Sequence, residues 1–223
     1  MVRTRINVLG GCLAALLLVT APASAQMPIL TYGFTDTSAA FTLNPDMVSG
    51  TYSAVADSDT DGDVTRPLPV SDTAYFEQDF TGGMADFVLS MAITGIGAGT
   101  ANGSGSFTIT DVDGDTITGN ISGTWNQLAG IFASFEGALS NVTVTSNDGM
   151  IHGTTGSFAA DLSDVGGPAP YPGAIVLLML PGNWFTANFS NANTLVQGAV
   201  VPEPATIALV VLGGLAAIRR RAA

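Results

Sequence analysis

Alternation of apolar and polar residues over positions 85–94 most strongly limits how this chain can fold. Every odd-numbered position in this segment is apolar, while Asp86, Ser90 and Thr94 lie between them. The same parity continues through residues 106–125, where the odd-numbered apolar positions include Phe107, Ile109, Ile117, Ile121 and Trp125. Alternate side chains point to opposite faces of a β-strand, so the pattern predicts half-buried strands that share one apolar face.

The loop between the second and third of these strands decides their register. A two-residue loop at positions 113–114 would pair Ile109 with Thr118 and put the two apolar rows on opposite faces. A three-residue loop at positions 112–114 pairs Ile109 with Ile117 instead, which keeps both rows on one face. We predict the three-residue loop, with its glycine at the left-handed third position.

Further strands are predicted at residues 131–139, 174–180 and 184–189. The segment 174–180 reads AIVLLML between two prolines. Seven residues are too few to span a bilayer, so we interpret this segment as a central buried strand. A second hairpin is predicted around the Asp-Gly pair at positions 148–149, with a two-residue turn that would pair Val144 with Gly153.

No segment between residues 26 and 201 has a convincing helical pattern. Many short strands joined by glycine-containing turns favour an all-β fold. We expect a single β-sandwich or jelly-roll-like domain, or a small barrel, with enough apolar residues for one core.

The charge of the chain is strongly acidic. It has 18 acidic residues and six arginines, with no lysine. Residues 26–201 contain 17 of the acidic residues and a single arginine, Arg66, which gives a formal charge of −16. Such a surface repels DNA and RNA, so no nucleic-acid partner is expected. Divalent cations and uncharged polymers are better candidates.

Residues 57–63, which read DSDTDGD, are the strongest local candidate for a metal site. The carboxylates come from Asp57, Asp59, Asp61 and Asp63. Their alternation resembles the first half of an EF-hand-type Ca²⁺ loop. The twelfth position is Leu68 instead of a bidentate glutamate, so Ca²⁺ would need another ligand, for which Asp72, Glu77 and Asp79 are candidates. A solvated acidic loop is the alternative reading.

The stretch 111–115, DVDGD, is a weaker cation candidate. The three-residue loop places Asp111 opposite Asp115, and directly opposed like charges destabilise a strand pair unless water or a cation lies between them. A simple hairpin turn is the alternative.

Residues 1–25 have the features of a secretory signal peptide. A positively charged start is followed by an apolar core and by a small-x-small site at positions 23–25. We predict cleavage by signal peptidase between Ala25 and Gln26. Cleavage removes Cys12, the only cysteine, so the mature chain has no disulfide and no cysteine metal ligand.

No catalytic residues are evident in the chain that follows the predicted cleavage point. His152 is the only histidine, and we expect it to be an ordinary strand residue, since one histidine without cysteine is a poor zinc set and no G-x-S-x-G elbow is present. We therefore predict that the protein is not an enzyme. A secreted hydrolase with paired carboxylates, Glu136 among them, stays a further alternative.

The last residues combine three parts in order: Pro202, Glu203 and Pro204, then an apolar run at 205–218, then Arg219, Arg220 and Arg221. Because the prolines stop a helix from extending upstream, it would begin at Ala205 and be roughly 21 Å long, against a bilayer core of roughly 30 Å. We predict one short C-terminal transmembrane helix, with the arginines cytoplasmic and the preceding chain outside.

This tail resembles the PEP-CTERM sorting signal of bacterial exported proteins. The resemblance lies in the Pro-Glu-Pro tripeptide, the short apolar run with Gly213 and Gly214, and the terminal arginines, and it covers about a tenth of the chain. It implies recognition by exosortase, a membrane protease-transpeptidase, and cutting near the tripeptide. After transient anchoring in the membrane, the resemblance implies delivery to the cell surface or to an exopolysaccharide matrix.

Four segments are therefore expected: a signal peptide at 1–25, an acidic β-rich extracytoplasmic domain at 26–190, a linker at 191–201 and a sorting and anchor segment at 202–223. The leading hypothesis is an exported, non-enzymatic surface or extracellular-matrix protein. The alternative is a Ca²⁺-dependent adhesion or carbohydrate-binding module.

Overall fold

The computed structural model describes residues 27–77, 85–128, 132–181 and 184–201, which form twelve β-strands and one short helix. The elements are β1 (Leu30–Leu43), β2 (Ser49–Val55), β3 (Asp61–Arg66), β4 (Asp72–Phe76), β5 (Asp86–Thr94), β6 (Thr100–Thr110), β7 (Thr116–Leu128), β8 (Phe132–Thr145), β9 (Met150–His152), β10 (Ser157–Ala159), α1 (Ser163–Gly166), β11 (Tyr171–Pro181) and β12 (Phe189–Val200). The predicted all-β class is confirmed.

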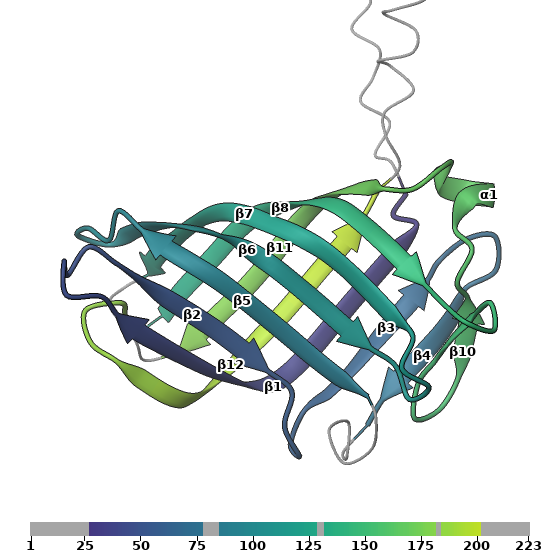
Figure 1. Cartoon of the computed structure of the whole chain (residues 1–223), viewed down its shortest axis with the longest axis horizontal. Helices are drawn as coiled ribbons and strands as arrows, with labels where there is room; N and C mark the ends of the chain where they lie inside the picture. Colours follow the sequence, from purple (N-terminus) through teal and green to yellow (C-terminus); the bar gives the residue numbers. More distant parts are fainter. Residues whose placement is uncertain (1–26, 78–84, 129–131, 182–183, 202–223) are drawn as a thin grey trace, which may run out of the picture.

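The main sheet closes on itself. Its ten strands are hydrogen-bonded in the order β12-β11-β8-β7-β6-β5-β2-β1-β3-β4, and β12 also pairs with β1. Eight antiparallel strands therefore form a closed ring in which each has two partners, so none of them is left as a sheet edge. In Figure 1 the front strands cross the rear strands at a steep angle, and the two halves enclose one core, as two sheets do in a sandwich.

The ring has two distinct ends because its strands alternate in direction. Leu30 lies opposite Val200, and the Ile29 N–H donates to the Val200 carbonyl at 2.8 Å. We call this the terminal end, and it also carries the loops at 111–115 and 146–170. The distal end carries the turns at 44–48 and 95–99. An even number of antiparallel strands returns the chain to the end at which it began.

Two insertions project from the terminal end. β3 and β4 continue the sheet beside the first half of β1, where Thr31 pairs with Thr65, while β9 and β10 form a separate two-stranded sheet. A bridge between Tyr75 and Thr155 joins the two insertions. They lie together at the right of Figure 1.

The predicted register of the β6–β7 hairpin is confirmed. Ile109 faces Ile117, Phe107 faces Gly119, and Gly114 adopts a φ of 87° at the third loop position. The glycine at 119 is required by packing, since a Cβ there would lie 2.6 Å from Cε1 of Phe107. The odd-numbered apolar side chains of β5, β6 and β7 are buried as predicted, and they include Phe87, Leu89, Met91, Ile93, Phe107, Ile109, Ile117, Ile121 and Trp125.

The predicted central strand at 174–180 is confirmed as part of β11, between β8 and β12. The predicted strand at 184–189 is wrong, because residues 185–187 form a turn. The predicted linker at 191–201 is also wrong, since β12 pairs with β1 on one side and β11 on the other. Its exposed positions, Ser190, Asn191, Asn193 and Gln197, are polar, while Thr194, Val196 and Val200 are buried. The domain therefore extends to Val200 and not to 190.

The predicted second hairpin does not form. β8 pairs with β7 as far as Thr145 and with β11 as far as Val142, whereas β9 pairs with β10 and not with β8. The Asp-Gly pair still makes a turn: Gly149 has a φ of 89°, and Asp148 Oδ1 accepts the Met150 N–H at 2.8 Å.

Aromatic rings fill the ring interior toward the distal end. Trp125 and Tyr52 are fully buried with ring centroids 5.2 Å apart. Phe185, from the turn before β12, lies 5.0 Å from the Trp125 ring and 4.8 Å from the Phe41 ring. This side chain therefore plugs the distal end of the core from outside the strands.

Among the described residues, no helix is long and apolar enough to cross a membrane. The predicted signal peptide with its cleavage point after Ala25, the predicted tail helix and the terminal arginines lie outside the described residues.

We predict that Phe185→Ala lowers the free energy of unfolding by about 3–5 kcal/mol, because it leaves a cavity among the five rings that contact Phe185, those of Phe41, Tyr52, Trp125, Trp184 and Phe189. Urea unfolding followed by Trp fluorescence measures the change. Tyr75→Ala is the matched control, since the Tyr75 side chain is exposed. Equal, small effects of both substitutions would contradict the assignment of Phe185 as a core residue.

Candidate functional site

The β6–β7 loop at the terminal end is organised by a buried carboxylate. Asp111 is 1% exposed. Its Oδ1 accepts the N–H groups of Asp113 at 2.9 Å and Asp115 at 2.8 Å, and its Oδ2 accepts the His152 N–H at 2.8 Å. The repulsion expected between Asp111 and Asp115 is therefore offset by backbone donors, since hydrogen bonds to the charged form stabilise a buried carboxylate.

Asp115 is buried in the same way, at 3% exposure. Its Oδ1 accepts the backbone N–H of Asn147 at 3.0 Å and the Asn147 side-chain amide at 2.8 Å. Together the two buried aspartates tie the 111–115 loop to both the 146–149 turn and β9.

The network brings three metal-ligating side chains together at the surface: Asp113, Asp148 and His152. Their ligand atoms all lie within 4.8 Å of one another, and no other such group of three occurs among the described residues. His152 Nε2 lies 3.0 Å from Asp148 Oδ2 and 3.8 Å from Asp113 Oδ2. The side chains are 31%, 52% and 56% exposed for His152, Asp148 and Asp113, so an ion would have access from solvent.

The carboxylates shift the titration of the imidazole. The hydrogen bond with Asp148 raises the pKa of His152 above its ordinary value of 6.5, with further attraction from Asp148, Asp113 and Asp111. The Met150 N–H and then the imidazole hold the pKa of Asp148 below its ordinary value of 3.8. The pair is therefore an ion pair at mildly acidic pH.

The contacts of His152 do not form a catalytic triad. The Ser146 hydroxyl donates to Asp148 Oδ1 at 3.1 Å, and His152 contacts the other oxygen of Asp148. The carboxylate thus lies between serine and histidine, whereas a nucleophilic serine needs the histidine next to its hydroxyl. Glu136 lies opposite Thr124 and Leu177, so neither directly opposed residue is a second carboxylate.

The predicted calcium loop is divided between a turn and a strand. Asp57 and Asp59 lie before β3, and Asp57 Oδ1 accepts the Asp59 N–H at 2.9 Å. Asp61 and Asp63 belong to β3, where same-face side chains are about 6.6 Å apart along the strand. These four carboxylates do not form a group of three ligand atoms within 4.8 Å, and Ca²⁺ binding there stays a prediction.

Gly62, which suggested the turn of a calcium loop, has a different role. It lies within β3 and faces the core, where an added Cβ would lie 2.1 Å from Cδ1 of Phe34. The glycine is therefore needed for the close approach of the Phe34 ring. Asp36, which the sequence pattern did not single out, also lies beside this stretch, since the Thr60 hydroxyl donates to the Asp36 backbone carbonyl at 3.4 Å.

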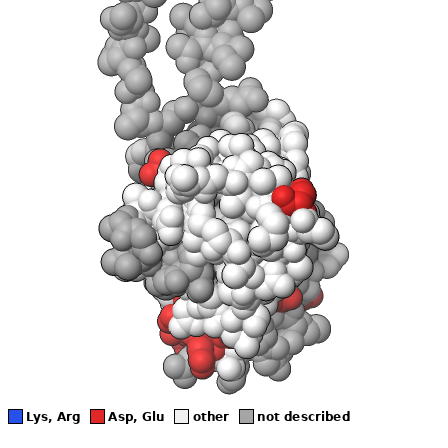
Figure 2. Space-filling view, turned by 90° about the vertical axis from the view of Figure 1, so that its left-hand side faces the viewer, with Lys and Arg blue, Asp and Glu red and all other residues white. Residues whose placement is uncertain are grey.

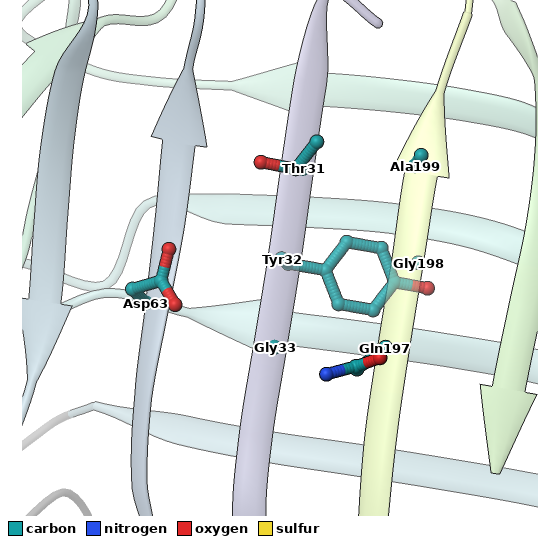
Figure 3. Close-up of a pocket in the computed structure, with 7 residues that line it drawn as sticks. All are labelled: Thr31, Tyr32, Gly33, Asp63, Gln197, Gly198 and Ala199. Carbon is teal, nitrogen blue, oxygen red and sulfur yellow. The ribbon is translucent and has the colours of Figure 1, made fainter.

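A shallow hollow of about 360 Å³ lies on the wall formed by β3, β1 and β12 (Figure 3). Its floor is Gly33, which pairs with Asp63 on one side and Gln197 on the other. Asp63 is held by the Thr65 hydroxyl at 2.9 Å. The Tyr32 ring lies across Gly198, and its burial raises the pKa of its hydroxyl. The hollow offers one carboxylate, from Asp63, and one side-chain amide, from Gln197, so it is a weak candidate for a catalytic or metal site.

The positive charge of the domain is buried. Arg66, the only Lys or Arg among residues 27–201, is 5% exposed. Its guanidinium donates to the carbonyls of Leu68 at 2.7 Å and Ala159 at 3.1 Å and pairs with Asp164. Figure 2 looks onto the distal end, where most of the surface is uncharged and Asp and Glu appear in a few separate places.

The prediction of His152 as an ordinary strand residue missed this cluster. His152 does lie in β9, but its imidazole reaches Asp148 across the turn. A sequence signal was available in the spacing of Asp148 and His152 around Gly149. The third member, Asp113, comes from a loop of a different hairpin, and only the fold brings it close.

The chain ends in a sorting segment of exported proteins. Residues 200–221 match the PEP-CTERM protein-sorting motif, which confirms the assignment made from Pro202, Glu203 and Pro204. The motif implies export and processing by exosortase. A search of curated proteins and a search of solved structures found no match to the chain.

We predict that the contribution of His152 to stability depends on pH. Because its pKa is raised on folding, this contribution is fully present below about pH 6.5 and is lost as the pH rises through the folded-state pKa. Asp148 has a lowered pKa, so its part is present above about pH 4 and is lost only as the pH falls further. His152→Gln should therefore lower the free energy of unfolding more at about pH 5.5 than at about pH 9.

Urea melts in the presence of EDTA test this prediction. Asp148→Asn is the matched control, since it removes the charge that raises the pKa of His152 and should flatten the pH dependence. An effect of His152→Gln that is equal at both pH values would contradict the ion pair.

Proposed function

We propose that the protein is an exported, non-enzymatic component of the cell surface or extracellular matrix, processed by signal peptidase and by exosortase. The match of residues 200–221 to the PEP-CTERM motif carries this proposal. The acidic domain is the part delivered, and the tail anchors it in the membrane only until it is cut.

The geometry of the chain ends supports this role. β12 ends at Val200, and the motif begins at that residue, so no spacer separates the ring from the sorting segment. The first strand of the ring leaves from the same end, because Leu30 pairs with Val200. While the tail is in the membrane, the terminal end therefore faces the bilayer and the distal end faces outward.

The outer face of β5, β6 and β7 supports association with an uncharged exopolysaccharide. Its even-numbered residues are exposed or half-buried, and Asp86 is the only charged one. Hydroxyl and amide side chains form cross-strand rows, such as Ser90, Ser106 and Asn120. A neutral polymer can exchange hydrogen bonds with such a face without removing charges from water.

Non-enzymatic function is supported by the arrangement of the polar groups. The interior of the ring holds buried aromatic rings, and Nε2 of the one histidine lies beside two aspartates, while the Ser146 hydroxyl donates to Asp148.

A second candidate function is Ca²⁺-dependent adhesion through residues 57–63. The observation that favours it is that Asp59 and Asp61 are both exposed beside the turn, in a domain with a formal charge of −16. Ca²⁺ prefers such carboxylate oxygens.

We predict that removal of residues 202–223 abolishes exosortase-dependent delivery and releases the folded domain in soluble form. The cut must spare β12, whose last residue is Val200, and Val201, whose N–H donates to the Pro172 carbonyl. Cell fractionation and surface protease accessibility measure the fate of the protein. Replacement of Pro202, Glu203 and Pro204 by alanine is the matched variant, which keeps the apolar run. Unchanged surface delivery of both variants would overturn the sorting role.

The calcium candidate predicts a stability change of the full chain. Ca²⁺ at a hundredfold excess over its Kd should raise the free energy of unfolding by about 2.7 kcal/mol. Asp59→Asn with Asp61→Asn should remove that increase, whereas Asp46→Asn, on the distal β1–β2 turn, should not. A calcium effect that is indifferent to the first two substitutions would exclude this loop as its origin.

A further inference from the structure

We propose that Asp113, Asp148 and His152 bind one divalent transition-metal ion of the Zn²⁺ type at the terminal end of the ring. This inference is independent of the proposed sorting function, since it concerns the folded domain alone. It also differs from the calcium candidate in residues, in place and in the class of ion.

The distances fit a small ion. Zn²⁺ binds nitrogen and oxygen ligands at about 2.0–2.2 Å in a tetrahedral arrangement, which puts neighbouring ligand atoms roughly 3.4 Å apart. His152 Nε2 lies 3.0 Å from Asp148 Oδ2 and 3.8 Å from Asp113 Oδ2, on either side of that value. Small side-chain rotations therefore suffice to surround an ion with three protein ligands, and water can fill the fourth position.

The donor set selects the class of ion. Ca²⁺ takes six to eight oxygen ligands and Mg²⁺ keeps most of its waters, so neither gains from an imidazole nitrogen. Imidazole suits Zn²⁺ and its neighbours in the first transition series, and carboxylates complete such sites. The imidazole separates this cluster from the purely acidic stretch at 57–63.

The ligands are held by residues that do not themselves face the ion. Asp111, which is 1% exposed, fixes the backbone N–H of both Asp113 and His152. Asp115, which is 3% exposed, holds Asn147 next to Asp148. Asp148 uses Oδ1 to accept the Met150 N–H, which leaves Oδ2 directed at the imidazole. Such outer contacts orient metal ligands and raise affinity.

The sole histidine makes the test direct. The full chain, produced with an affinity tag that contains no histidine, is labelled with ¹⁵N-histidine and titrated with Zn²⁺, Ca²⁺ and Mg²⁺ after treatment with EDTA. Only one imidazole contributes ¹⁵N signals. Their chemical shifts should change as Zn²⁺ is added, and the change should saturate at one equivalent. Zn²⁺ should also raise the melting temperature, while Ca²⁺ and Mg²⁺ should leave the imidazole unshifted.

Variants assign the ligands. His152→Gln and Asp113→Asn should each weaken Zn²⁺ binding by at least about tenfold in calorimetric titration, the loss that even an outer-shell change produces. Asp57→Asn, in the other acidic stretch, is the matched control and should bind Zn²⁺ like the wild type. Asp113 lies in an exposed loop, where a substitution does not disturb the core. If the His152 variant does not fold, the Asp113 variant still tests the proposal.

Unchanged Zn²⁺ affinity in the Asp113 and His152 variants would overturn the proposal. A saturable imidazole shift with Ca²⁺ or Mg²⁺ at lower concentration than with Zn²⁺ would overturn the class of ion and with it the proposed site.

Discussion

The pairing of β1 with β12 is the interaction on which the rest of the structure depends. It joins the first and last strands of the sheet over most of their length, from Leu30 opposite Val200 to Phe41 opposite Phe189. Without it, β1 and β12 would each lose a partner, and the open sheet would expose two edges together with the aromatic core. A disulfide-free exported domain therefore obtains its stability from closure of the sheet and not from covalent cross-links.

Closure also determines where the chain can carry function. Because eight antiparallel strands return to their starting end, both chain ends, both insertions and the Asp113–Asp148–His152 cluster gather at the terminal end. The sorting motif begins at Val200, where the wall of the ring ends. The distal end, into which Phe185 packs, lies at the opposite end of the ring.

The sequence predicts those parts of the structure that depend on a residue pattern within one short stretch, and it misses those that depend on pairing between distant strands. The register of β6 and β7 follows from apolar parity, since only a three-residue loop lets Ile109 face Ile117. β12 was not predicted, because its exposed residues are Ser, Asn and Gln, and its pairing depends on β1, which lies at the other end of the sequence. The hairpin expected at Asp148 did not form: Ile151 pairs with Phe158 of β10, and the His152 N–H donates to Asp111 Oδ2. In both cases the contacts that the strand makes lie outside the local sequence pattern.

The two aspartate-rich stretches show why composition alone does not locate a site. Both have acids at alternate positions next to a glycine, yet Gly62 serves the packing of Phe34 while Gly114 makes a left-handed turn. The strand geometry of β3 spreads Asp61 and Asp63 along one wall. The loop geometry of 111–115 instead turns Asp111 and Asp115 inward onto backbone N–H groups and leaves Asp113 outside, beside an imidazole. Burial of two carboxylates is therefore what positions the third, whereas none of the four carboxylates at 57–63 is buried.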